Sequence, residues 1–142
     1  MLTEPQKQKL DKILSQAKDD EDILAVMLYG SRVREMEEVT PSSDLDICLV
    51  LDPGENHNKR SERTVPPTRK RLDYLSKIDP GMVDLQVFQQ LPIYIRKRIL
   101  EEGQLKYCKN KSKLYDLAYR TIQEYENFAP RMNEYLEGVK NG

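Results

Sequence analysis

Three aspartates occupy positions at which strands with a buried apolar face are expected. Asp44 and Asp46 open the apolar run "DLDICLVL" (44–51), and Asp84 lies inside "MVDLQVF" (82–88). Because side chains alternate along a strand, Asp44 and Asp46 project from the face opposite to their apolar neighbours, and Asp84 does the same. If the two strands are close together, the three carboxylates converge, and their mutual repulsion calls for a cation.

A site that offers carboxylate oxygens and leaves coordination positions open suits Mg²⁺, because this ion keeps several water ligands and binds substrate phosphates. Two such ions held about 4 Å apart activate an attacking oxygen and stabilise a leaving pyrophosphate. We therefore expect Asp44, Asp46 and Asp84 to be both metal ligands and catalytic residues. For any one aspartate alone, a structural role is an equal alternative: Asp44 could cap a turn, and Asp84 could pair with an arginine.

A glycine–serine pair ends the preceding apolar run, "ILAVMLYG" (23–30). Gly30 allows the backbone to approach a ligand closely, and the following amides with the Ser31 hydroxyl can cradle phosphate oxygens. Arg32 adds positive charge beside them. We expect Gly30, Ser31 and Arg32 to form a site for phosphate groups, which the resemblance described below assigns to a nucleotide. The combined pattern is more specific than any of its parts. It consists of a strand, the Gly-Ser pair, a loop and a strand that begins with Asp-x-Asp, followed by a third aspartate on a later strand.

The stretch "GSRVREMEEVTPSSDLDICLVL" (30–51) resembles the signature of the minimal nucleotidyltransferases, a branch of the DNA polymerase beta-like superfamily. "VDLQVF" (83–88) is similar to the strand that carries the third carboxylate of the family. The following "LPIYIRKRILEEGQLKYCKN" (91–110) is similar to the helix and edge strand that end its domain. The resemblance covers residues 22–108.

The resemblance implies an enzyme that transfers AMP from ATP to an acceptor hydroxyl and releases pyrophosphate. It assigns the triphosphate to Gly30 and Ser31, and two Mg²⁺ ions to Asp44, Asp46 and Asp84. Small family members with a C-terminal helical tail resemble antitoxins of two-gene systems whose toxin is a HEPN-type ribonuclease, inactivated by adenylylation of a tyrosine. We therefore expect ATP as substrate and a HEPN-type toxin as partner, in a homo-oligomer or hetero-oligomer.

Two alternatives stay open. In the first, the site is catalytically silent and the antitoxin acts by binding alone. In the second, the same chemistry serves a small-molecule acceptor such as an aminoglycoside. The short chain, with no obvious second domain to build a small-molecule pocket, argues against the second alternative.

The remaining elements must position these residues. The patterns predict helices over residues 3–18, 68–78 and 92–103 and strands over 23–30, 44–51, 82–88 and 104–108. Thr3 and Gln6 can form a capping box, and Leu72 and Leu75 are expected to face the core. Helices and strands alternate, which predicts an α/β (α+β) nucleotidyltransferase fold: a small mixed sheet flanked by helices. The first two strands should be antiparallel neighbours, and the strand over 104–108 should form an edge.

Residues 1–110 are expected to form the nucleotidyltransferase domain, and residues 111–142 a C-terminal helical tail with a break or kink at Pro130. Apolar and tyrosine side chains recur in the tail at helical spacing: Leu114, Ala118, Ile122, Tyr125, Met132 and Leu136, with Tyr115, Tyr119, Phe128 and Tyr135 beside them. The stripe either packs on the domain's own sheet or forms an arm that contacts another protein.

The composition of the chain further narrows the class of protein. One third of the 142 residues are charged, but the net charge is only −1, which argues against direct nucleic-acid binding. The basic segment 59–71 is interpreted as a solvated loop and helix face. Cys48 and Cys108 lie far apart without a metal-binding spacing, as expected of reduced thiols. With no apolar leader and no membrane-length stretch, we expect a cytoplasmic protein.

Overall fold

Four strands form a single mixed sheet in the computed structural model, which describes residues 2–30, 45–54, 66–78, 81 and 83–141. The strands are β1 (Ile23–Tyr29), β2 (Leu45–Leu51), β3 (Val83–Val87) and β4 (Gln104–Cys108), in the order β3-β2-β1-β4. β1 pairs antiparallel with β2 and β4, while β2 and β3 are parallel. The predicted antiparallel neighbours, the edge strand and the mixed sheet are confirmed.

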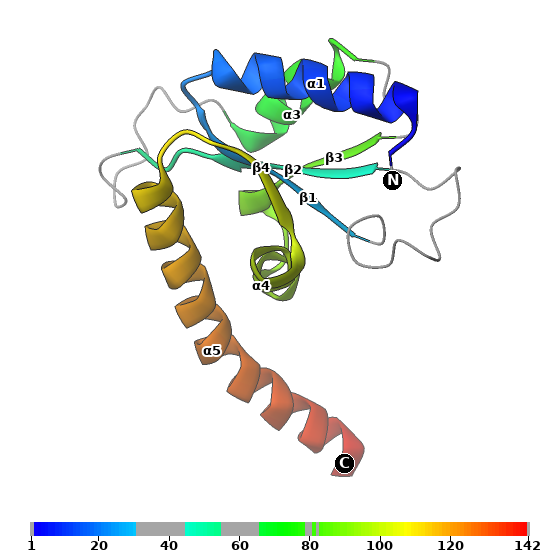
Figure 1. Cartoon of the computed structure of the whole chain (residues 1–142). Helices are drawn as coiled ribbons and strands as arrows, with labels where there is room; N and C mark the ends of the chain where they lie inside the picture. Colours follow the sequence, from blue (N-terminus) through cyan, green and yellow to red (C-terminus); the bar gives the residue numbers. More distant parts are fainter. Residues whose placement is uncertain (1, 31–44, 55–65, 79–80, 82, 142) are drawn as a thin grey trace.

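Helices cover both faces of the sheet, with α1 (Glu4–Lys18) and α3 (Pro67–Leu75) on one side and α4 (Ile93–Glu102) and the start of α5 (Lys111–Asn141) on the other (Figure 1). The two central strands are therefore buried on both faces, which explains why their sequences are nearly continuous apolar runs. A short 3₁₀ helix, η1 (Phe88–Gln90), connects β3 to α4.

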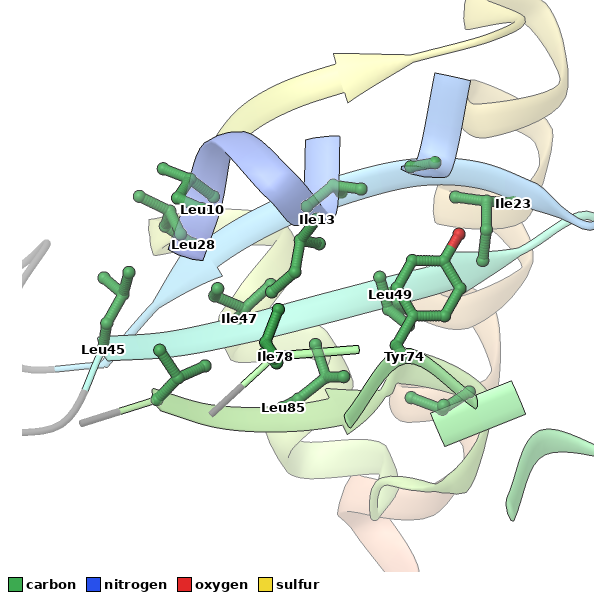
Figure 2. Close-up of a cluster of buried hydrophobic side chains, with 14 of the residues drawn as sticks. Leu10, Ile13, Ile23, Leu28, Leu45, Ile47, Leu49, Tyr74, Ile78 and Leu85 are labelled. Carbon is green, nitrogen blue, oxygen red and sulfur yellow. The ribbon is translucent and has the colours of Figure 1, made fainter. Parts of the chain in front are cut away.

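The core between the sheet and the α1–α3 layer is formed by alternate residues of the strands. Leu45, Ile47 and Leu49 of β2 and Leu85 of β3 point into it, and they meet Leu10 and Ile13 of α1 and Tyr74 of α3 (Figure 2). Because neighbouring side chains alternate, Asp46 and Asp84 point to the other face, which carries α4 and α5. The fold thus places the predicted acidic residues on the α4–α5 side.

The N-terminal helix begins as predicted. The Thr3 hydroxyl accepts a hydrogen bond from the Gln6 backbone amide, and the Gln6 side-chain oxygen accepts one from the Thr3 backbone amide. Leu10, Ile13 and Ala17 are buried. α4 also follows its prediction, since Pro92 precedes its first residue and Gly103 is its C-cap.

The inward face of α3 differs from the prediction. Leu72 is 57% exposed, whereas Lys70 and Tyr74 are buried and Leu75 is partly buried. The expectation for Leu72 is therefore wrong. Lys70 can be buried because Asp20 and Asp22 pair with its ammonium group, and these partners lie far from it in the sequence.

The tail forms one long helix. α5 runs from Lys111 to Asn141 through Pro130, so a break there is wrong, and the alternative of a kink stays a prediction. Pro130 is exposed, where water can hydrogen-bond the carbonyl left without an amide partner. No described helix combines the length and the apolar character needed to cross a membrane.

The two halves of α5 have different surroundings. In the first half, Leu114 and Thr121 are buried, Glu124 pairs with Arg96 of α4, and the Lys97 ammonium lies 4.5 Å from the Tyr125 ring centre. The second half extends away from the rest of the molecule (Figure 1). The first half of α5 thus packs on α4 and the sheet, while contact of the second half with a partner stays a prediction.

Candidate active site

Asp46 and Asp84 lie side by side on adjacent strands. They are direct partners in the register of the parallel pair β2–β3, and Asp46 is also opposite Tyr29 in the antiparallel pair β1–β2. The three half-buried residues form a row across the sheet, on the α4–α5 side. Side chains directly opposite one another have Cβ atoms about 5 Å apart, so the two carboxylates share one patch.

The other predicted site residues, Asp44, Ser31 and Arg32, lie outside the described residues. Among those that the structure describes, no three potential metal-ligating side chains gather at one place. The structure therefore brings together two of the three predicted carboxylates, and it leaves the role of the third as a prediction.

Gly30 closes β1 directly beside Asp46. Its φ of +90° lies in the region that glycine adopts far more easily than other residues. A Cβ atom added to Gly30 would overlap Oδ2 of Asp46. The carboxylate thus occupies the space that a side chain would take, and glycine at this position is what allows Asp46 to approach the turn.

Gln86 was not anticipated from the sequence. It follows Asp84 by two positions on β3, so both project from the same face, and its Nε2 donates a 2.9 Å hydrogen bond to Oδ1 of Asp84. The sequence contained a signal for it: a polar residue two positions from a candidate ligand in the same strand projects from the same face as that ligand.

Tyr29 and Cys48 lie beside the Asp46 and Asp84 carboxylates as uncharged groups. Burial raises the pKa of the Tyr29 phenol well above its ordinary value, and Cys48, Asp46 and Asp84 nearby raise it further. Burial also raises the pKa of the Cys48 thiol. Both groups are therefore protonated at neutral pH, and Cys48 acts as a small apolar residue in the core beneath α4.

The donor set of the site fits a hard divalent cation. Two adjacent carboxylates offer oxygen ligands, and Gly30 beside them is exposed. Asp46, Asp84 and, from the sequence, Asp44 are the residues that could hold Mg²⁺.

A hollow of about 670 Å³ lies elsewhere, between the start of β1 and α3. Its wall includes Lys70, Asp20 and Tyr74, and these groups satisfy one another through hydrogen bonds. It is at the opposite end of β1 from Gly30, and so it is not part of the carboxylate site.

The sequence matches the family model described as Polymerase beta, Nucleotidyltransferase over residues 8–112. The chain belongs to this nucleotidyltransferase family, and the predicted resemblance and fold are confirmed. No curated protein sequence matches the chain.

Solved structures share the fold over almost the whole chain. A chain from a toxin–antitoxin crystal structure with AMP-PNP has a TM-score of 0.61 at 16% identity, covering 93% of this chain and 96% of that one. A chain from the tri-AMPylated Shewanella oneidensis HEPN toxin in complex with MNT antitoxin has a TM-score of 0.62 at 16% identity, covering 94% and 98%. A chain from an MntA-HepT toxin–antitoxin structure has a TM-score of 0.59 at 16% identity, covering 94% and 97%.

Proposed function

We propose that this protein is a Mg²⁺-dependent nucleotidyltransferase that transfers AMP from ATP to a tyrosine of a HEPN-type ribonuclease toxin, and that it acts as the antitoxin of that toxin in the cytoplasm. The observation that carries this proposal is the register of β2 and β3, which aligns Asp46 with Asp84 beside the glycine turn. Membership of the nucleotidyltransferase family supports the reaction class.

In this proposal, Asp44, Asp46 and Asp84 would hold two Mg²⁺ ions, which would supply charge stabilisation to the transferred adenylyl group. Gly30 and Ser31 hold the triphosphate, and Arg32 offsets part of its negative charge. Asp84 accepts the proton of the acceptor hydroxyl. The acceptor oxygen forms a bond to the α-phosphorus while the bond to the β-phosphate oxygen breaks, and pyrophosphate leaves. The protein contributes mainly positioning and electrostatic stabilisation.

The choice of a protein acceptor is supported by the arrangement of α5. The carboxylates and α5 are on the same side of the sheet, and Tyr115, Tyr119 and Leu136 on α5 are more than half exposed. Tyrosine-rich surfaces are common in protein interfaces. The similar solved structures are toxin–antitoxin complexes, and in one of them the HEPN toxin is tri-AMPylated.

The decisive experiment follows transfer of label from ATP. The protein is incubated with Mg²⁺, ATP labelled in its α-phosphate and the purified product of the neighbouring gene, and the labelled residue is found by mass spectrometry. We expect label on a tyrosine of the partner. The double variant Asp44→Asn/Asp46→Asn should lose at least about 100-fold in rate, because the charge that stabilises the transition state is gone. Asp11→Asn, an exposed change on α1, is the matched control.

Equal labelling by the wild type and the double variant would contradict the proposal. Neutralisation of the toxin without ATP, equally by both proteins, would favour an antitoxin that acts by contact alone through α5. Label on an aminoglycoside and on no protein would favour the small-molecule acceptor.

A further inference from the structure

Gln86 is a polar residue in an apolar part of the sheet. In the parallel register it is the partner of Cys48, which is fully buried and lies opposite Met27 of β1. The face of the sheet beneath α4 is otherwise formed here by apolar side chains, including Val50 and Phe88. A half-buried amide in such surroundings loses hydration and is disfavoured unless it finds a hydrogen-bond partner.

The partner that Gln86 finds is the Asp84 carboxylate, which accepts its Nε2–H group at 2.9 Å. Hydrogen bonds to an ionised acceptor are stronger than those between neutral groups. Within the described ranges, no other side chain donates a hydrogen bond to Asp84, so the amide alone restrains one oxygen of this carboxylate and leaves the second without a side-chain donor.

Gln89 shows what a glutamine with a purely structural role looks like in the same segment. Its side chain donates to the carbonyl of Leu51 and accepts from the amide of Leu51, which fastens η1 to the end of β2. Gln86 makes no comparable bond to the backbone among the described residues. Its position is therefore explained by Asp84 and not by the needs of the sheet.

We propose that Gln86 is a positioning residue that holds the Asp84 carboxylate in one orientation, with Oδ1 bound to the amide and Oδ2 left for a divalent cation. This inference rests on the proposed function and adds a residue to the same site. Groups that hydrogen-bond a metal-ligating side chain typically contribute about 10- to 100-fold to metal affinity or activity.

The test measures Mn²⁺ affinity of the full chain by electron paramagnetic resonance in the presence of a non-hydrolysable ATP analogue. The variants are Gln86→Leu, Asp84→Asn and the double variant of both, and Gln89→Leu is the matched control. Gln86→Leu should weaken Mn²⁺ binding by about 10-fold, while Gln89→Leu should lower the melting temperature but leave the affinity unchanged. Because Gln86 acts through Asp84, the double variant should bind Mn²⁺ no more weakly than Asp84→Asn alone.

Wild-type affinity in Gln86→Leu, or losses that add in the double variant, would overturn this inference and leave the proposed function intact. A parallel loss in Gln89→Leu would show that reduced stability is the cause, which also overturns it. Absence of Mn²⁺ binding by the wild-type chain with the analogue would instead overturn the proposed function itself.

Discussion

At the scale of single residues, the site depends on the close approach of the Asp46 carboxylate to the backbone of Gly30, which has no side chain. Gly30 combines a positive φ with a direct approach of Asp46 to its Cα, so two separate physical requirements exclude other residues there. Gly54 also has a positive φ, +82°, but an added Cβ would meet nothing within 4 Å. A substitution at Gly54 therefore has only the free-energy cost of the backbone conformation, whereas a substitution at Gly30 has that cost and the cost of displacing Asp46.

We predict that Gly30→Ala lowers the rate of AMP transfer by at least about 100-fold, because the new methyl group displaces the Asp46 carboxylate from its position beside Asp84. Gly54→Ala should lower the free energy of unfolding by about 1 kcal/mol without changing the rate. The measurements are label transfer and denaturant unfolding of both variants. Similar rates for Gly30→Ala and Gly54→Ala would show that the approach of Asp46 to Gly30 is unimportant.

At the scale of elements, an ion cluster connects α3 to the turn between α1 and β1. The Lys70 ammonium lies 3.1 Å from Oδ2 of Asp20 and 2.9 Å from Oδ2 of Asp22, and the Tyr74 hydroxyl donates to Asp20 at 2.9 Å. The Lys70 side chain is only 9% exposed. A charge buried to this degree requires its partners, so the cluster holds α3 against the sheet.

The pKa values of the cluster set the pH range in which it stabilises the fold. Burial by itself would raise the pKa of Asp20, but hydrogen bonds from the Asp22 amide, Tyr74 and Lys70 hold the pKa below its ordinary value. Burial by itself would lower the pKa of Lys70, but Asp22 and Asp20 raise it overall. The Asp20 contribution is therefore lost as the pH falls through its lowered pKa, and the Lys70 contribution is lost as the pH rises through its raised pKa.

We predict that Lys70→Met lowers the free energy of unfolding by about 2–3 kcal/mol at neutral pH, because two carboxylates lose their cation. The difference from the wild type should be constant between about pH 5 and pH 9 and shrink as the pH falls below about 4, toward the lowered pKa at which Asp20 becomes protonated. Denaturant unfolding at a series of pH values measures it. Arg98→Met, which breaks an exposed pair with Glu102 within α4, should cost less than about 0.5 kcal/mol. A Lys70→Met effect as small as this control would contradict the structural role of the cluster.

At the scale of the whole molecule, α5 is fastened to the domain at its start and leaves it further along. Asp52 at the end of β2 pairs with Lys109 at 2.7 Å and Lys113 at 3.3 Å, while Arg96 pairs with Glu124 at 3.2 Å. Beyond these contacts the helix extends on the side of the sheet that carries the carboxylates (Figure 1). A protein bound to the second half of α5 would thus lie on the same side as the candidate active site.

We predict that a chain ending at residue 128 keeps its melting temperature within a few degrees and still binds ATP, because the contacts of α4 with α5 are preserved. A chain ending at residue 111 should be strongly destabilised, since it loses Leu114 from the core and Glu124 from its pair with Arg96. Binding of the neighbouring gene product, measured by calorimetry, should be much weaker for the chain ending at 128. Unchanged binding by that chain would exclude the second half of α5 as the contact surface.

The sequence by itself determined the elements and the chemistry of the site. Continuous apolar runs define β1 and β2, the Thr3–Gln6 capping box defines the start of α1, and the two-residue period of a strand places Asp46 on the face opposite to Leu45 and Ile47. These features are local, because they depend on residues within a few positions of one another, and local patterns can be interpreted without knowing the fold.

Only the tertiary structure decided which distant groups meet. Lys70 faces inward in place of Leu72 because Asp20 and Asp22, about fifty positions earlier, are brought to it by the packing of α3 on the sheet. The approach of Asp46 to Gly30 likewise depends on the pairing of β1 with β2. The course of α5 was undetermined for a related reason: an amphipathic stripe has the same pattern whether its own domain or another protein covers it, and only the packed structure shows where its own contacts end.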